Sequence, residues 1–131
     1  MSDIRILLVD DELEFAETLA ERLRIRSFEV IVTGRADEAL EAINAGLHPD
    51  IVLLDIKMPG IDGLDALKEI KSREPDIEII LLTGHGAADS SIEGMRRGAF
   101  DYLMKPVEIG ELTTKIEQAA ARRRKAGERR K

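Results

Sequence analysis

The sequence predicts an α/β domain built on a doubly wound, five-stranded parallel sheet, and three observations lead to this prediction. Short apolar segments rich in branched residues alternate five times with segments whose apolar residues have helical spacing. The first, third and fourth short segments are almost wholly apolar, as in strands covered on both faces. The chain has 131 residues, 44% of them hydrophobic and 35% charged, which fits one globular domain.

Five strands are predicted at the short apolar segments, and they are joined by crossovers that contain the helices. Right-handed crossovers leave few topologies, and the strand order 2-1-3-4-5 is favoured, although periodicity alone does not exclude half of a Rossmann fold. The predicted strands are residues 4–9, 29–33, 50–54, 77–82 and 100–104.

Five helices are predicted between and after the strands. In the first, Leu13 and the later Ala and Leu residues at helical spacing form an apolar stripe that should face the core. Gly46 and Gly98 stand where the second and fourth helices should stop, and Pro75 lies just past the third. The fourth helix has the weakest pattern, and Gly127 marks a frayed end or the start of a linker. The predicted helices are residues 13–26, 36–45, 63–73, 88–97 and 109 to about 125.

Several classes of function are excluded by composition. The chain has no cysteine, which rules out disulfides, thiolate catalysis and cysteine-ligated zinc, and makes the cytoplasm the expected compartment. No apolar run approaches the roughly 20 residues that cross a bilayer, and the N-terminus does not look like a signal peptide. His48 and His85 lie far apart in sequence and make a poor basis for a soft-metal site.

Charge is divided unevenly along the chain. Residues 122–131 carry seven basic side chains and one acidic one, whereas the other 121 residues carry 13 basic and 25 acidic groups. The acidic body argues against nucleic-acid binding by the domain itself. Two interpretations of the basic tail stay open: solvated cations at a helix C-terminus, or a contact with nucleic acid or an acidic partner.

Charged and hydroxyl side chains follow the strands whose carboxyl ends should meet at one edge of the sheet. With the order 2-1-3-4-5, the first and third strands are neighbours, so their acids should converge on one crevice. These carboxylates repel one another, and their pKa values should rise unless a cation lies among them. The residues concerned are Asp10, Asp11 and Glu12 after the first strand, Asp55 after the third, Thr83 after the fourth and Lys105 after the fifth.

This set of residues suits phosphoryl transfer assisted by a hard metal ion. Oxygen ligands without cysteine fit Mg²⁺, with Mn²⁺ as the alternative, better than zinc. Asp55 stands alone on its strand end and is the predicted nucleophile, whereas the paired acids are better placed to hold the metal. The sequence has neither a GxxxxGK[ST] nor a GxGxxG loop, so the donor is expected to be another protein or a small phosphodonor rather than a nucleotide.

Four segments in this order resemble the receiver domain of two-component response regulators, the CheY-like family. The resemblance covers residues 4–122 and leaves 123–131 as a basic C-terminal tail or the start of a linker. The matching segments are residues 9–11 (VDD), 54–63 (LDIKMPGIDG), 82–84 (LTG) and 98–106 (GAFDYLMKP).

The resemblance implies a signalling switch rather than an enzyme, with at most Mg²⁺-dependent self-phosphorylation and self-dephosphorylation. It implies that Asp55 takes a phosphoryl group from a histidine kinase or a phosphotransfer protein. Asp10 and Asp11 would hold Mg²⁺ together with Asp55 and the backbone carbonyl of Lys57. Lys105 would pair with the phosphoryl group.

The resemblance also implies how the signal leaves the site. Thr83 would hydrogen-bond the phosphoryl group, and Tyr102 would move into the space that the Thr83 hydroxyl leaves. This movement would switch the face formed by the fourth helix, fifth strand and fifth helix, which would bind partners. The family further implies a cis peptide bond between Lys105 and Pro106. Lys57 and His85 occupy positions that tune the loss of phosphate in the family, and Val107 stands where Phe is frequent.

Several alternatives stay open at this point. Asp11 alone could simply cap the first helix, with Glu14 completing a capping box. A haloacid-dehalogenase-like phosphatase, a flavodoxin-like cofactor binder and a scaffold without phosphorylation are the competing functions. The chain could be a stand-alone regulator that acts on a downstream protein, or a fragment that has lost its output domain. A homodimer could pair charges across the face carrying Arg96, Arg97, Asp101, Glu111 and Lys115.

Overall fold

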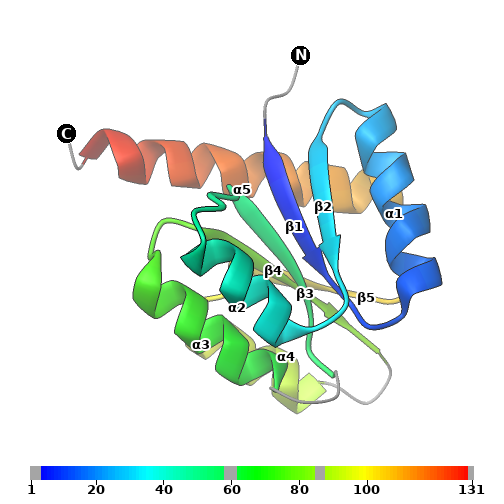
Figure 1. Ribbon diagram of the computed structural model, residues 1–131, viewed down its shortest axis with the longest axis horizontal. Coiled ribbons are helices and arrows are strands. Elements are labelled where there is room, and N and C mark those ends of the chain that lie inside the picture. Colours follow the sequence, from blue (N-terminus) through cyan, green and yellow to red (C-terminus); the bar gives the residue numbers. More distant parts are fainter. Residues whose placement is uncertain (1–3, 58–61, 85–87, 130–131) are drawn as a thin grey trace.

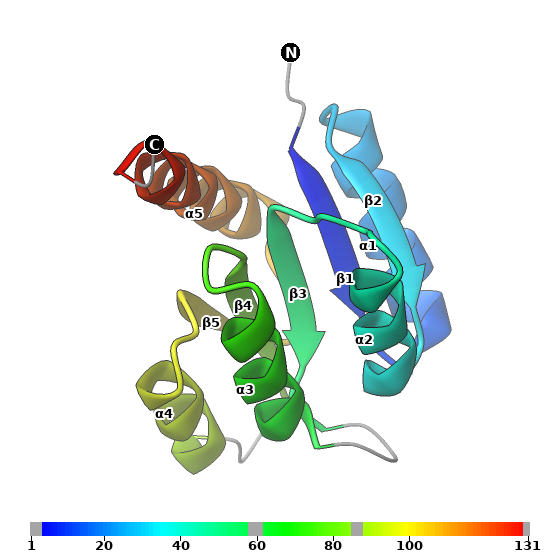
Figure 2. The ribbon, with the colours of Figure 1, turned by 60° about the vertical axis from the view of Figure 1, so that its left-hand side comes forward.

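The computed structural model describes residues 4–57, 62–84 and 88–129, and it confirms the predicted fold class. One parallel sheet has the strand order β2-β1-β3-β4-β5. Helices cover both faces, with α1 and α5 on one side and α2, α3 and α4 on the other (Figures 1 and 2). The strands are β1 (Arg5–Val9), β2 (Glu29–Thr33), β3 (Ile51–Asp55), β4 (Glu78–Thr83) and β5 (Asp101–Met104).

The helices begin where they were predicted and differ from the prediction only at their ends. α3 begins at Gly63 because the side chain of Asp62 accepts a hydrogen bond from the Leu64 N–H at 2.7 Å, which caps the first turn. α5 extends four residues beyond the predicted end. The helices are α1 (Leu13–Ile25), α2 (Ala36–Asn44), α3 (Gly63–Arg73), α4 (Ala88–Arg96) and α5 (Ile109–Arg129).

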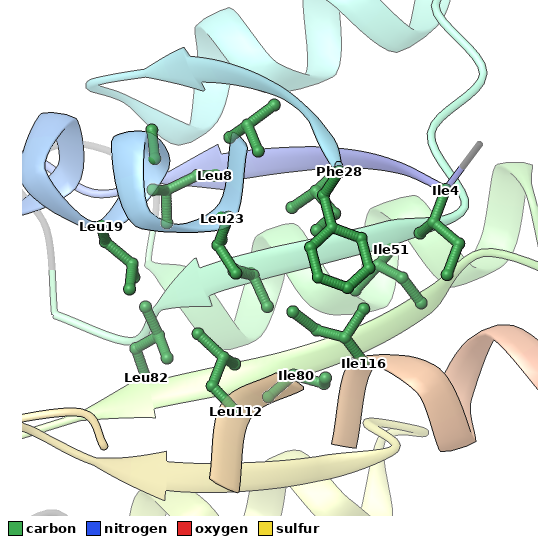
Figure 3. Packing of buried hydrophobic residues seen from close by; sticks show 14 of the residues in the cluster. Ile4, Leu8, Leu19, Leu23, Phe28, Ile51, Ile80, Leu82, Leu112 and Ile116 are labelled. Atoms are coloured by element: carbon green, nitrogen blue, oxygen red, sulfur yellow. The ribbon is translucent and has the colours of Figure 1, made fainter. Parts of the chain in front are cut away.

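The core is split by the sheet into two clusters because successive strand residues point to opposite faces. In β1, Ile6 and Leu8 pack toward α1 and α5, whereas Leu7 and Val9 pack toward α2 and α3. Every residue of β3 and β4 is buried, as their apolar sequences predicted. Figure 3 shows the first cluster, in which Leu23 and Leu112 bring α1 and α5 onto the sheet.

Leu13 is the exception to the predicted apolar stripe of α1. Its side chain is 57% exposed, whereas Ala16, Leu19, Ala20 and Leu23 are buried. As the first residue of the helix, Leu13 lies at the end of the stripe and lines an open groove together with Phe15 and Val107. Its prediction as a core residue was therefore wrong.

The start of the basic tail is tied to the body of the domain. Glu78 is buried at the beginning of β4, and both of its carboxylate oxygens accept hydrogen bonds from the Arg122 guanidinium. The same guanidinium lies 4.5 Å from the centre of the Phe100 ring, and Arg123 pairs with Asp50 at 3.4 Å. These two arginines therefore do not belong to a purely solvated cationic tail, because they compensate acids of the domain.

Three of the five charges considered for a dimer contact, Arg97, Asp101 and Lys115, pair within the chain instead. Lys115 of α5 forms an ion pair with Asp101 of β5, and Arg97 pairs with Glu93 and Asp65.

Within the described residues, no helix combines the length and apolar character that crossing a bilayer requires.

Candidate functional site at the carboxyl edge of the sheet

The predicted acids converge because β1 and β3 are adjacent. Asp10 directly follows β1 and Asp55 is the last residue of β3, one position inside the strand rather than after it. Asp10 is 0% exposed and Asp55 is 5% exposed, whereas Asp11 lies on the surface. Carboxylate oxygens of these three residues lie within 4.8 Å of one another. The predicted cluster therefore forms in the folded chain.

Hydrogen bonds from the backbone fix the two buried carboxylates. The N–H of Glu12 donates to Asp10 Oδ1 at 2.9 Å, and the N–H of Lys57 donates to Asp55 Oδ1 at 3.2 Å. In each case the second oxygen is left for a cation. Asp10 Oδ2 is buried and accepts no hydrogen bond of regular geometry, and its charge is met by Lys105 Nζ at 2.8 Å. This arrangement presents two oriented carboxylate oxygens to one point.

Lys105 supplies the cation of the site from the end of β5. Besides Asp10, its Nζ lies 3.6 Å from Asp55 Oδ2 and 2.6 Å from Glu12 Oε1. The ammonium also lies 4.7 Å from the centre of the Phe15 ring. Burial disfavours its charge, but the close carboxylates of Asp10 and Glu12 outweigh burial and raise the pKa of Lys105. Lys105 is therefore a permanent positive charge in this site.

Asp55 has the electrostatic properties of a reactive group. Its burial, followed by the charge of Asp10, raises the pKa of the Asp55 carboxyl to about 7. The ammonium of Lys105 and the Lys57 N–H oppose this rise without cancelling it. A carboxyl group with a pKa this high is a recognised indicator of a functional site. A further cation beside Asp55 would keep it ionised near neutral pH.

Thr83 and Tyr102 lie on adjacent strands beside the cluster. Thr83 ends β4, is 2% exposed and donates a long hydrogen bond of 3.4 Å from its Oγ1 to the Leu103 carbonyl. Tyr102 lies on β5 opposite Leu81, and 41% of it is exposed. Thr83 is thus buried and Tyr102 partly exposed, and their roles in a switch stay predictions.

The chain passes close to Asp55 at the start of α3, where only glycine fits. A Cβ atom at Gly63 would lie 2.7 Å from the carbonyl oxygen of Asp55 and 2.6 Å from that of Ile56. Contacts this short to backbone atoms cannot be relieved by moving a side chain. Gly63 also donates a hydrogen bond from its N–H to the Ile56 carbonyl at 3.1 Å, which fixes the path of the chain behind Asp55.

Some sequence predictions gain structural detail and others stay predictions. The alternative role of Asp11 as a helix cap is not seen, because α1 is preceded by Glu12 and no side chain caps it. The Lys105–Pro106 peptide bond is cis, as the family resemblance implied. The metal-binding role of the Lys57 carbonyl stays a prediction. His85 lies outside the described residues, as do residues 58–61 between Lys57 and Asp62.

The contacts of Glu12 and Phe15 with Lys105 were missed by the sequence reasoning. Glu12 directly precedes α1 and Phe15 lies in its first turn. Both are some ninety positions from Lys105, so no local sequence pattern links them to it. Glu12 was predicted to lie at this edge of the sheet, as a fourth carboxylate beside Asp10, Asp11 and Asp55, but its pairing with Lys105 was not predicted. Phe15 lies outside the predicted apolar stripe of the first helix, so the stripe gave no indication of its contact with Lys105.

The donor set suits Mg²⁺ or Mn²⁺. A buried carboxylate oxygen of Asp10 without a regular hydrogen bond and a nearby oxygen of Asp55 are hard anionic ligands, and Asp11 adds one more from the surface. Hydrated Mg²⁺ is commonly held by one or two carboxylates, and three acids within a few ångströms meet that requirement. The residues present therefore fit the ion that the sequence predicted.

The fold and the site together define a class: small parallel α/β domains with an acidic cluster, a lysine and a threonine at the carboxyl edge of the sheet. A model of the response regulator receiver domain matches residues 6–117 of this chain. The chain belongs to the family of receiver domains of two-component response regulators, as its sequence motifs predicted.

Relatives of known identity agree with this assignment. The regulatory protein AtoC of Escherichia coli K12 is 39% identical over 115 residues, which cover 88% of this chain and 25% of that protein. The DNA-binding transcriptional regulator NtrC of the same strain is 38% identical over 114 residues, or 87% of this chain and 24% of that protein. The chain thus spans about a quarter of the length of these regulators.

Solved structures show the same fold. A response regulator receiver domain protein from Clostridium thermocellum has a TM-score of 0.88 at 37% identity and covers 92% of this chain and 97% of its own. The receiver domain of NtrX from Brucella abortus has a TM-score of 0.84 at 36% identity, over 88% of this chain and 98% of its own.

Proposed function

We propose that Asp55 accepts a phosphoryl group from a histidine kinase or a phosphotransfer protein in a Mg²⁺-dependent reaction. The observation that carries the proposal is the convergence of Asp10, Asp55 and Lys105, with Lys105 Nζ 2.8 Å from the first carboxylate and 3.6 Å from the second. Such an arrangement orients a nucleophilic carboxylate and supplies positive charge for a phosphoryl group. The family of the chain supports the same role.

In the transfer step, an oxygen of the Asp55 carboxylate forms a bond to phosphorus while the phosphorus–nitrogen bond of the donor phosphohistidine breaks. The imidazole nitrogen leaves with the electron pair. Asp10, Asp11, Asp55 and the Lys57 carbonyl would hold Mg²⁺, which would supply positive charge that keeps the carboxylate ionised and offsets the charge of the phosphoryl oxygens. Lys105 then pairs with these oxygens, and Thr83 donates a hydrogen bond to them.

The proposed output surface consists of α4, β5 and α5. Four large apolar side chains are exposed on its first two elements, which suits a contact with another protein: Ile92, Met95, Tyr102 and Met104. The partner is a downstream protein, a second copy of the chain or an output domain attached after it.

The proposed domain division stays as predicted, with a receiver domain at residues 4–122 and a tail or linker at residues 123–131. The proposed location of the protein is the cytoplasm. The structure adds that residues 123–129 continue α5 as a helix.

Phosphorylation is tested with acetyl phosphate and Mg²⁺, followed by intact-mass measurement under native conditions. The wild-type chain is expected to gain the mass of one phosphoryl group, and Asp55→Asn is expected to gain none, because the amide is not a nucleophile. Asp50→Asn is the matched control, since Asp50 immediately precedes the opposite end of the same strand. A modified residue other than Asp55, or no gain in mass with Mg²⁺ present, would refute the proposal.

The proposed switch is tested by the fluorescence of Tyr102. The chain has one tyrosine and no tryptophan, so its tyrosine fluorescence reports on Tyr102 alone. Beryllium fluoride with Mg²⁺ is expected to reduce the quenching of this fluorescence by acrylamide, because the ring moves from its 41% exposed position toward Thr83. Asp55→Asn should show no change. Unchanged quenching in a chain that does become phosphorylated would contradict the switch and leave the acceptor role standing.

A further inference from the structure

Glu12 makes the shortest contact of the Lys105 ammonium, yet it has no role in the function proposed above. Its Oε1 lies 2.6 Å from Nζ, compared with 2.8 Å for Asp10 Oδ2 and 3.6 Å for Asp55 Oδ2. An ammonium group has three hydrogens to donate. The two closest partners of the ammonium are thus Asp10 and Glu12, and neither is the proposed nucleophile Asp55.

The two close partners differ in how easily Lys105 can leave them. The side chain of Asp10 is 0% exposed, so a separated Asp10 carboxylate would be a buried charge without compensation. The side chain of Glu12 is 64% exposed, so water would solvate its carboxylate once the contact is broken. Glu12 is therefore the partner that the ammonium can exchange for a new one.

We propose that Glu12 is a positioning residue that competes with phosphorylated Asp55 for the Lys105 ammonium and thereby weakens the phosphorylated state. The inference rests on the proposed role of Asp55. A phosphoryl group adds about −1.5 to −2 charges and three acceptor oxygens beside Nζ, which already lies 3.6 Å from Asp55. Close pairing with these oxygens draws the ammonium from its 3.6 Å separation toward Asp55, which lengthens its 2.6 Å contact with Glu12, and the Glu12 carboxylate also repels the new charge.

Phe15 limits where the ammonium can go during this exchange. Its ring centre lies 4.7 Å from Nζ, so the aromatic face attracts the same cation that Glu12 holds. Glu12 itself is fixed through its backbone, whose N–H donates to Asp10 Oδ1. The side chain of Glu12 therefore keeps Lys105 on the α1 side of the site until a stronger anion appears on Asp55.

The test is the affinity of the chain for beryllium fluoride at saturating Mg²⁺, measured by calorimetry. Glu12→Gln is expected to bind about five times more tightly than wild type, since an exposed ion pair is worth up to about 1 kcal/mol. Glu14→Gln is the matched control, because it removes the same charge from α1 at a position that forms no ion pair with Lys105 among the described residues. It should change the affinity less than about twofold.

Glu12→Asp separates the contact from the mere charge. Aspartate keeps the negative charge but is shorter by one methylene, so the contact with Nζ is lost. The affinity should rise, but by less than in Glu12→Gln, because the charge that repels the phosphoryl group stays. Wild-type affinity in Glu12→Asp, or no rise in Glu12→Gln beyond that of Glu14→Gln, would overturn the inference alone. Failure of wild type to bind beryllium fluoride with Mg²⁺ would instead overturn the proposed function on which the inference rests.

Discussion

Replacement of Lys105 by methionine is expected to lower the free energy of unfolding by about 3 kcal/mol in Mg²⁺-free buffer near pH 8. The methionine fills a similar volume but leaves the fully buried Asp10 carboxylate without its cation, 2.8 Å away in the wild-type chain. Asp55 and Glu12 then repel Asp10 without compensation. Urea denaturation of both chains measures the difference, and Mg²⁺ should restore part of the loss.

Lys115→Met is the matched control for this prediction. Lys115 also forms an ion pair, with Asp101, but both side chains are partly exposed. Its loss should cost at most about 1 kcal/mol, and Mg²⁺ should not affect it. An equal loss of stability in the two variants would show that Lys105 does not compensate buried charge.

The second large effect is a gain of stability on replacing Asp55 by asparagine. The folded state raises the pKa of Asp55 from 3.8 to about 7, through burial first and the charge of Asp10 second. The folded chain thus binds this proton more tightly than the unfolded chain. The resulting stability is fully present below about pH 4 and is lost as the pH rises through about 7.

Asparagine is a neutral isostere that can still accept the hydrogen bond from the Lys57 N–H, so it removes this dependence on pH. In the presence of EDTA, Asp55→Asn should exceed wild type by roughly 2–4 kcal/mol near pH 8 and match it near pH 4. Urea denaturation across this range is the measurement. Asp11→Asn, which alters the exposed acid of the cluster, should show a much smaller gain. A stability difference for Asp55→Asn that is constant with pH would contradict the conclusion that the fold raises the pKa of Asp55.

With added Mg²⁺, the wild-type chain should become more stable than Asp55→Asn. Mg²⁺ that binds the folded wild-type chain raises its free energy of unfolding. Asp55→Asn has lost one of the three carboxylates that lie within 4.8 Å of one another, so it should bind the ion more weakly and gain less stability. The same substitution thus stabilises the chain without metal and removes its response to metal. This combination distinguishes a functional acidic cluster from a purely structural one.

Much of the fold and most of the site could be predicted because they depend on local patterns. The alternation of apolar strands and amphipathic helices specifies the layers, and residues at strand ends fall on one edge of any parallel sheet. Asp10, Asp55 and Lys105 were predicted together for that reason, and the structure brings them together. The exposed Leu13 was mispredicted because helical spacing does not show where a stripe extends past the sheet.

The sequence by itself favoured the strand order and determined the acids that converge and the family to which the chain belongs, because these follow from short segments read in order. Only the tertiary structure decided which partners each charge takes. Glu12 meets Lys105 across 93 positions, and Glu78 meets Arg122 across 44. Each pair contains one largely buried charge, Lys105 or Glu78, which burial penalises unless an opposite charge lies beside it. Which partner lies near enough depends on how the helices pack rather than on any sequence spacing.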